Sequence, residues 1–322
     1  MSNSKHILIT GGAGFIGSQT AEFLLNRGDR VTVLDAFAYS YDPIHKEHNV
    51  TLLERHAGFK LLRADIRDTD VLETFFAEDP PDAVIHLAAR AGVRPSLLDP
   101  ADYADINIRG TITILEKMKK YGCTQMVFAS SSSVYGSRNQ GPFKETDNVD
   151  VPVSPYAATK RAGELICATY NHLYNMDITC LRFFTVYGPR QRPEMAIHLF
   201  ADRIRRGQAI SMFGDGSSMR DYTFVADIVK GVVSALDKPM GYQIINLGNS
   251  SPIRLDGLIA AIAEAVGKEP IIERLPDQPG DVPMTFASVD RATRLLGYQP
   301  DTPLLDGLRL FVAWLNEYDP IA

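Results

Sequence analysis

Cysteine is scarce in this chain: three residues among 322, far apart and none in a C-x-x-C pair. Zinc sites and disulfide frameworks need paired or closely spaced cysteines, so the sequence predicts neither, and we expect no metal. Cys123, Cys167 and Cys180 are instead expected to be small buried side chains in a reducing compartment.

Long apolar runs and an excess of positive charge are also missing. No window reaches the roughly 20 apolar residues of a membrane span, and the first residues, MSNSKHILIT, lead directly into a strand rather than a signal segment. Lys and Arg number 33 against 39 Asp and Glu, a net charge of -6, which disfavours nucleic acid and anionic membranes as partners. We therefore expect a cytoplasmic protein with neither of these partners.

The first half of the chain alternates short apolar runs with helical patterns. Such alternation predicts an α/β fold, a Rossmann doubly wound parallel sheet built from βαβ units. The strands are expected at His6–Thr10, Val31–Leu34, Lys60–Arg63, Ala83–Leu87 and Met126–Ala129. Helices are expected at Phe15–Arg27 and, after a capping Asp68, at Thr69–Ala77.

After about residue 180 Pro and Gly cluster and the strand-like pieces shorten, for example at Gln243–Asn246. Two late helices are predicted at Leu255–Val266 and Leu304–Glu317. We therefore predict a dinucleotide-binding domain of residues 1–180 plus about 221–242. A smaller C-terminal α/β substrate domain is predicted from about 181–220 and 243–322.

A glycine-rich loop, GGAGFIG at residues 11–17, follows the first strand and opens the first helix. Glycine allows the tight turn and the close approach of backbone to a pyrophosphate, and the helix N-terminus attracts phosphate. Asp35 ends the second strand, where an acid accepts hydrogen bonds from an adenosine ribose and repels a 2′-phosphate. These features predict NAD rather than NADP.

Tyr156 and Lys160 are four residues apart, which places them on one face of a helix. A nearby ammonium favours the phenolate form of tyrosine, so Tyr156 is a candidate base for a sugar hydroxyl. Ser131, just past the strand Met126–Ala129, is placed to hydrogen-bond the reacting oxygen.

Together these motifs resemble the extended short-chain dehydrogenase/reductase superfamily, closest to its nucleotide-sugar epimerases and dehydratases. The matching segments cover essentially the whole chain in the family's order: GGAGFIG at 11–17, HLAA at 86–89, SSSVYG at 131–136, SPYAATK at 154–160 and RDYTFV at 220–225. The resemblance implies a catalytic triad of Ser131, Tyr156 and Lys160.

The resemblance also assigns the binding residues. It places the cofactor on Gly11, Gly14, Phe15, Ile16, Gly17, Asp35, Asp65, Ile66, Leu87, Ala88, Ala89 and Asn107, together with Tyr156 and Lys160. For the UDP part of a substrate it implies Phe213, Arg220 and Asp281.

Two serines narrow the reaction. Dehydratases of this family carry Asp-Glu directly after the catalytic hydroxyl residue, and UDP-glucuronate decarboxylases carry Glu at the second of those positions. Ser132 and Ser133 stand there, and neither is an acid or base of the needed strength. C4 epimerisation through a transient 4-keto sugar is what remains.

Thr185, in LRFFTVYGP at 181–189, and RPEMA at 192–196 resemble UDP-glucuronate 4-epimerases. Arg192 is the candidate partner of the uronate carboxylate, because a guanidinium holds a carboxylate through two hydrogen bonds. Arg190, Gln191 and Ala36 depart from that group's usual residues. UDP-glucose 4-epimerase, a decarboxylase and a silent NAD-binding regulator are the alternatives.

Relatives in this family are commonly dimers, so the resemblance also implies a homodimer through two helices, near Asp102–Lys119 and Pro155–Tyr174. An apolar stripe of Ala104, Ile108, Ile112 and Leu115 fits either an interface or the core.

Overall fold

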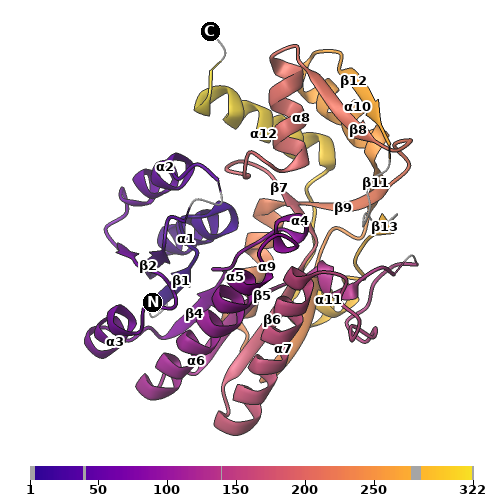
Figure 1. Ribbon diagram of the computed structural model, residues 1–322. Helices are drawn as coiled ribbons and strands as arrows, with labels where there is room; N and C mark the ends of the chain where they lie inside the picture. Colours follow the sequence, from indigo (N-terminus) through magenta and orange to yellow (C-terminus); the bar gives the residue numbers. More distant parts are fainter. Residues whose placement is uncertain (1–3, 39–40, 139, 277–283, 321–322) are drawn as a thin grey trace.

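The computed structural model describes residues 4–38, 41–138, 140–276 and 284–320. Its largest sheet has seven strands in the order β10-β6-β5-β4-β1-β2-β3, and every neighbouring pair is parallel (Figure 1). The strands are β1 (His6–Thr10), β2 (Arg30–Asp35), β3 (Phe59–Arg63), β4 (Ala83–His86), β5 (Gln125–Ser131), β6 (Asp177–Phe183) and β10 (Tyr242–Leu247). The predicted Rossmann fold is confirmed.

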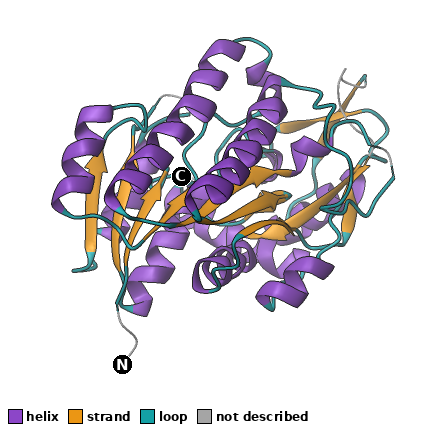
Figure 2. Cartoon of the chain, turned by 90° about the horizontal axis from the view of Figure 1, so that it is seen from below, coloured by secondary structure: helices purple, strands orange, loops and turns teal. Residues whose placement is uncertain are grey.

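Helices cover both faces of this sheet (Figure 2). Along β1, Ile7 and Ile9 pack into one core, while Leu8 packs into the core on the opposite face, as the alternation of side chains in a strand requires. The connecting helices are α1 (Phe15–Arg27), α2 (Ile44–Leu53), α3 (Thr69–Glu78), α4 (Val93–Ser96), α5 (Pro100–Ala104), α6 (Gly110–Tyr121), α7 (Pro155–Tyr174) and α9 (Val225–Asp237). Short π and 3₁₀ turns lie at Asp105–Arg109 and Ser132–Tyr135.

Helix starts follow local chemistry where the sequence provides it. The Asp68 carboxylate accepts a hydrogen bond from Val71 N at 3.1 Å and caps α3, as expected. Ser154 caps α7 in the same way, accepting from Ala157 N at 3.1 Å, with Pro155 at the first helical position. This start fixes Tyr156 in the first turn of α7 and Lys160 one turn later.

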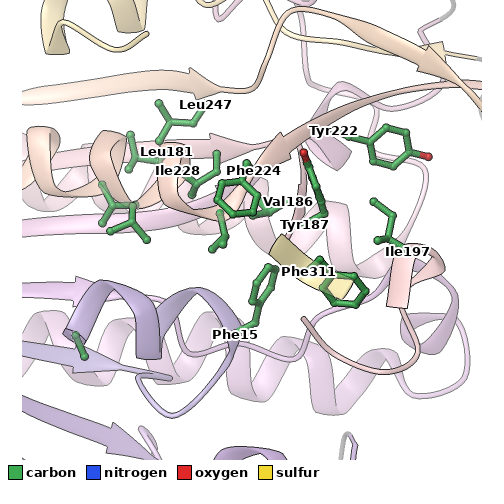
Figure 3. Packing of buried hydrophobic residues seen from close by; sticks show 14 of the residues in the cluster. Phe15, Leu181, Val186, Tyr187, Ile197, Tyr222, Phe224, Ile228, Leu247 and Phe311 are labelled. Carbon is green, nitrogen blue, oxygen red and sulfur yellow. The ribbon is translucent and has the colours of Figure 1, made fainter. Parts of the chain in front are cut away.

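The remaining strands form smaller sheets beside the large one, and four further helices of the described residues accompany them. They comprise β7 (Thr185–Tyr187), α8 (Ala196–Arg205), β8 (Ala209–Phe213), β9 (Met219–Phe224), β11 (Pro252–Arg254), α10 (Leu255–Val266), β12 (Ile271–Leu275), β13 (Met284–Thr285), α11 (Asp290–Leu296) and α12 (Leu304–Tyr318). One hydrophobic core runs from Leu181 and Leu247 of the large sheet to Phe224 and Phe311, so both parts share their packing (Figure 3).

Two strands lie where the sequence did not place them. The segment from about residue 221 is predicted to belong to the dinucleotide-binding domain, and its strand β9 pairs with β7, β11 and β13 rather than with a strand of the large sheet. The seventh strand is β10, which contains the Gln243–Asn246 segment assigned to the smaller part and pairs with β6. A strand-then-helix pattern reports only local conformation, and the pairing partner is decided by tertiary packing.

Within the described ranges, no helix is long and apolar enough to cross a membrane, and no group of three or more His, Cys, Asp or Glu side chains is arranged to hold a metal ion. Cys123, Cys167 and Cys180 are all buried thiols.

Candidate active site

A cavity of about 840 Å³ lies beyond the carboxyl ends of β1, β2, β4 and β5. The strand order reverses here, because β1 has β2 on one side and β4 on the other, and such a switch point is where open α/β sheets bind ligands. The predicted residues that line it are Gly11, Gly14, Phe15, Ile16, Gly17, Asp35, Asp65, Ile66, Leu87, Ala88, Ala89, Ser131, Tyr156, Lys160, Thr185, Arg192 and Arg220.

The glycine loop packs too closely for any side chain at two positions. A Cβ on Gly11, whose φ is +68°, would lie 2.8 Å from Ala88 N, and one on Gly17 would lie 2.4 Å from Gly11 O. The loop after β1 therefore lies directly against the residues that follow β4, and the first turn of α1 lies against this loop. Gly14 has no side chain with which to cap α1, so the first N–H groups of the helix are available to an anion.

Asp35 lies buried at the end of β2, at the cavity wall. Its carboxylate accepts hydrogen bonds from Ala13 N at 3.2 Å and Phe37 N at 2.9 Å. It also forms a 2.8 Å ion pair with Lys46, whose side chain is only 12% exposed. Lys46 lines the cavity as well, so a carboxylate and an ammonium lie side by side where an adenosine ribose is expected.

A buried network holds the wall formed by the end of β4. His86 contacts Thr10 Oγ1 at 2.7 Å through Nδ1 and Thr111 Oγ1 at 3.0 Å through Nε2, and Ala88 N donates to Thr10 Oγ1 at 3.2 Å. Burial, with a further contribution from the charge of Lys160, lowers the pKa of His86 to about 3, so the ring is neutral. His86 is therefore a structural support for Ala88.

The cofactor role that the resemblance assigns to Asn107 stays a prediction. Asn107 is buried, and its amide bonds the backbone of Arg90 on both sides, accepting from the N–H at 2.7 Å and donating to the C=O at 3.1 Å. It also donates to Thr159 Oγ1 at 3.0 Å. Among the described residues the cavity lining does not include Asn107, which lies behind the Arg90 wall and shapes the cavity from there.

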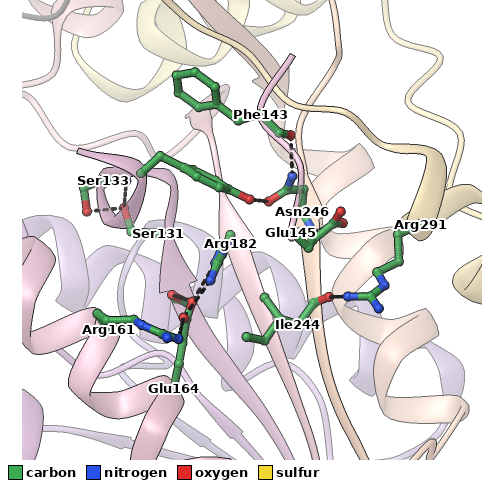
Figure 4. A network of polar contacts seen from close by, with 12 residues as sticks. Ser131, Ser133, Phe143, Glu145, Arg161, Glu164, Arg182, Ile244, Asn246 and Arg291 are labelled. Carbon is green, nitrogen blue, oxygen red and sulfur yellow. Dashed lines mark hydrogen bonds and ion pairs between the residues drawn. The ribbon is translucent and has the colours of Figure 1, made fainter. Parts of the chain in front are cut away.

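Ser131, Tyr156 and Lys160 meet at one end of the cavity. Ser131 Oγ accepts hydrogen bonds from Ser133 N at 3.2 Å and Ser133 Oγ at 3.0 Å, so its own proton is free to point elsewhere (Figure 4). Burial raises the pKa of Tyr156, while the Ser131 hydroxyl and the positive charge of Arg192 act in the opposite direction.

Lys160 is buried and donates one hydrogen bond to Ala129 O at 2.7 Å. An ammonium has three N–H donors, so two are left for the cavity. Its nitrogen lies 6.0 Å from the centre of the Tyr156 ring. Burial lowers the pKa of Lys160 to about 8.

A buried ion pair fastens α7 to β5 and β6 behind these residues. Glu164 accepts hydrogen bonds from Arg182 Nε at 2.8 Å and from Arg182 Nη2 at 2.9 Å (Figure 4). It also accepts a hydrogen bond from Ser130 Oγ at 2.6 Å. Ser130 directly precedes Ser131, and Glu164 lies one turn beyond Lys160. These contacts therefore hold α7, which carries Tyr156 and Lys160, against β5, which carries Ser131, and against the neighbouring strand β6.

Thr185, Arg192 and Arg220, the residues predicted to bind the substrate, also line the cavity. Arg192 forms an ion pair with Glu194 at 3.2 Å, and its side chain is 24% exposed. Phe213, at the end of β8, is not part of the lining formed by the described residues, and Asp281 lies outside those residues.

Several lining residues carried no assignment in the sequence. Tyr41, Lys46, Arg90, Arg94 and Met195 all contribute. They come from loops and short turns, where no periodic pattern reveals which way a side chain points. A pairing such as Lys46 with Asp35 spans 11 residues and follows from the fold rather than from local spacing.

A family model for the NAD dependent epimerase/dehydratase family matches residues 7–248. The chain belongs to this family. It is 43% identical over 313 residues to a UDP-glucuronate 4-epimerase of Thermodesulfobacterium geofontis, covering 97% of this chain and 96% of the relative.

Solved structures of family members are similar throughout. A UDP-glucuronic acid 4-epimerase from Bacillus cereus, in complex with UDP-glucuronic acid and NAD, superposes with a TM-score of 0.91 and 35% identity, covering 97% of this chain and 99% of that one. A UDP-glucose 4-epimerase from Thermotoga maritima with UDP-glucose gives a TM-score of 0.89 and 33% identity, with the same coverage.

Proposed function

We propose that this chain is an NAD-dependent UDP-sugar 4-epimerase that interconverts UDP-glucuronate and UDP-galacturonate. The observation that carries the proposal is the meeting of two groups in one cavity. Tyr156 and Lys160 supply the chemistry of alcohol oxidation, and Arg192, whose charge acts on the Tyr156 hydroxyl, supplies a carboxylate partner. The similarity to UDP-glucuronate 4-epimerases supports the same substrate.

The residues present fit NAD. The bare glycine loop and the start of α1 suit its pyrophosphate, and the buried Asp35 suits an adenosine ribose. Asp65 and Ile66 line the cavity near the expected adenine, and Leu87, Ala88 and Ala89 line the remainder. When bound, NAD accepts a hydride from C4 of the sugar and returns it.

In this proposal Tyr156 removes the proton of the C4 hydroxyl as the C4–H bond breaks. Lys160 favours the tyrosinate through its positive charge. Ser131, whose oxygen already accepts two hydrogen bonds, donates a hydrogen bond to the sugar oxygen and keeps its proton. On the return of the hydride to the opposite face, Tyr156 gives the proton back.

The 4-keto intermediate explains why the orientation of the uronate carboxylate must be fixed. A 4-keto uronate is a β-keto acid, which loses CO₂ when its C–CO₂ bond aligns with the carbonyl π system. Arg192 and Thr185 are proposed to hold the carboxylate away from that alignment. Ser132 and Ser133, which line the cavity in place of acids, provide no group for dehydration.

Arg220 is proposed to bind the UDP phosphates, together with Phe213 and Asp281 at the nucleotide. A homodimer and a cytoplasmic location also belong to the proposal. Exposed apolar side chains on α6 and α7, namely Ile112, Leu165 and Leu173, support a helix-mediated dimer, whereas Leu115 of the predicted stripe is buried in the core. We also propose the two domains predicted from the sequence, one of residues 1–180 plus about 221–242 and one of about 181–220 and 243–322.

Replacing Arg192 tests the substrate. Arg192→Ala should weaken binding of UDP-glucuronate by roughly 1–3 kcal/mol, typical of a lost charged hydrogen bond, and leave UDP-glucose unaffected. Arg190→Ala is the matched control, because this neighbouring arginine pairs with Glu22 at 2.6 Å instead. An equal loss for both sugars would contradict the carboxylate role, and turnover of UDP-glucose alone would favour the UDP-glucose 4-epimerase alternative.

A further inference from the structure

Five aromatic and histidine side chains outside the cavity join two of its walls. They come from three helices: His45 and His48 from α2, His198 from α8, and Trp314 and Tyr318 from α12. We refer to these five residues as the aromatic clasp. The C-terminal end of α12 lies above α2 in Figure 1, although the two helices are more than 250 residues apart in sequence.

Tyr318 makes the contact with α2. Its hydroxyl lies 2.8 Å from His45 Nδ1, and the two rings stack with centroids 5.3 Å apart. The His48 ring meets the same tyrosine edge-on at 4.9 Å. One tyrosine therefore holds two residues of α2 that lie almost one turn apart.

The clasp continues from Tyr318 to the loop that contains Gln191 and Arg192. Trp314 stacks on Tyr318 at 5.0 Å with the rings 15° from parallel, and the His198 ring meets Trp314 edge-on at 5.9 Å. His198 Nδ1 lies 2.7 Å from Gln191 O, the carbonyl directly before Arg192. Gln191 Nε2 also donates to Val186 O at 3.0 Å, so this loop is held at both ends.

Each end of the clasp is attached to residues that line the cavity. His45 directly precedes Lys46, which pairs with the ribose-site Asp35, and its ring lies 6.0 Å from that of the lining residue Tyr41. The other end is attached to Gln191, which directly precedes the lining residue Arg192. The cofactor side and the sugar side of the cavity are therefore connected through α12, by side chains that do not themselves line it.

We propose that the aromatic clasp keeps the cavity closed over bound NAD, and that Tyr318 and His45 are positioning residues for this closure. The chemistry requires such a device, because the hydride taken from a sugar must return to that sugar before the reduced cofactor leaves. Family membership supplies the use of NAD, so this inference does not depend on the identity of the sugar.

The experiment measures the release of NAD from purified holoenzyme, by loading labelled NAD and chasing it with an excess of unlabelled NAD. Tyr318→Phe removes one hydrogen bond and keeps the stacking, so release should be about threefold to tenfold faster. Tyr318→Ala should accelerate it further. With saturating NAD, kcat of Tyr318→Phe should stay close to that of the wild type, which separates cofactor retention from chemistry.

Tyr298→Phe is the matched control. Its hydroxyl donates to Gly248 O at 3.0 Å, and the residue is buried in the core rather than placed at the cavity. This variant should release NAD at the wild-type rate. An unchanged rate in Tyr318→Phe, or equal acceleration in Tyr298→Phe, would overturn the inference. Since release is measured without turnover, failure here is distinct from failure of the proposed sugar specificity.

Discussion

The pairing of Lys46 with Asp35 gives a sharp prediction about cofactor choice. Asp35 both repels a 2′-phosphate and forms an ion pair with the Lys46 ammonium at 2.8 Å. Asp35→Ala removes the repulsion and releases Lys46 to face the phosphate. A hydrogen bond to a charged group contributes about 1.5–3 kcal/mol, so the affinity for NADP should rise roughly 10- to 150-fold.

The assay is calorimetric titration of cofactor-stripped protein with NAD and with NADP. Asp35→Ala leaves Ala13 N and Phe37 N without their acceptor, so unfolding in urea is measured in parallel. The double variant Asp35→Ala/Lys46→Met should lose the gain in NADP affinity. If the double variant keeps that gain, Lys46 is not the phosphate partner, and equal wild-type affinities for the two cofactors would refute the role of Asp35.

Three further predictions concern the reactive residues and their support. Tyr156→Phe should lower the rate by about 10²–10⁴ with UDP-sugar affinity nearly unchanged, measured by steady-state kinetics and calorimetry; a fully active variant would exclude Tyr156 as the base. Glu164→Gln should cost about 3–5 kcal/mol in urea unfolding, because it leaves the buried Arg182 charge unpaired, and a loss below about 1 kcal/mol would contradict this. The pKa of Lys160 is about 8 in the folded protein and 10.5 when unfolded, so the folded state binds fewer protons between these pH values. The free energy of unfolding of the cofactor-free protein should therefore rise by about 3 kcal/mol as the pH increases from 8 to 10.5. This rise should be absent in Lys160→Met, and identical pH profiles for the two proteins would rule it out.

Local patterns predicted the elements that contain the site. The helix Phe15–Arg27 and the strand His6–Thr10 have the predicted ends, because glycine punctuation and a continuous apolar run define them. The motif residues of the glycine loop and the Tyr156–Lys160 pair line the cavity for the same reason. Their positions depend on neighbours only a few residues away.

What the sequence could not supply depends on distant contacts. The place of β9 follows from the buried Asp221, whose carboxylate accepts hydrogen bonds from Asn249 N at 2.9 Å and Ala287 N at 2.9 Å. The position of Asn107 behind the cavity wall follows from its bonds to Arg90. No spacing rule predicts contacts between segments 17 to 66 residues apart.

In the proposed reaction, hydride leaves and returns to the same carbon of a uronate. The most direct measurement follows UDP-glucuronate carrying deuterium at C4, with NAD present, and resolves the products by mass and NMR. We expect UDP-galacturonate with deuterium kept at C4, little UDP-pentose and no net NADH. Deuterium lost to water, mainly UDP-pentose, or no turnover of the uronate would contradict it.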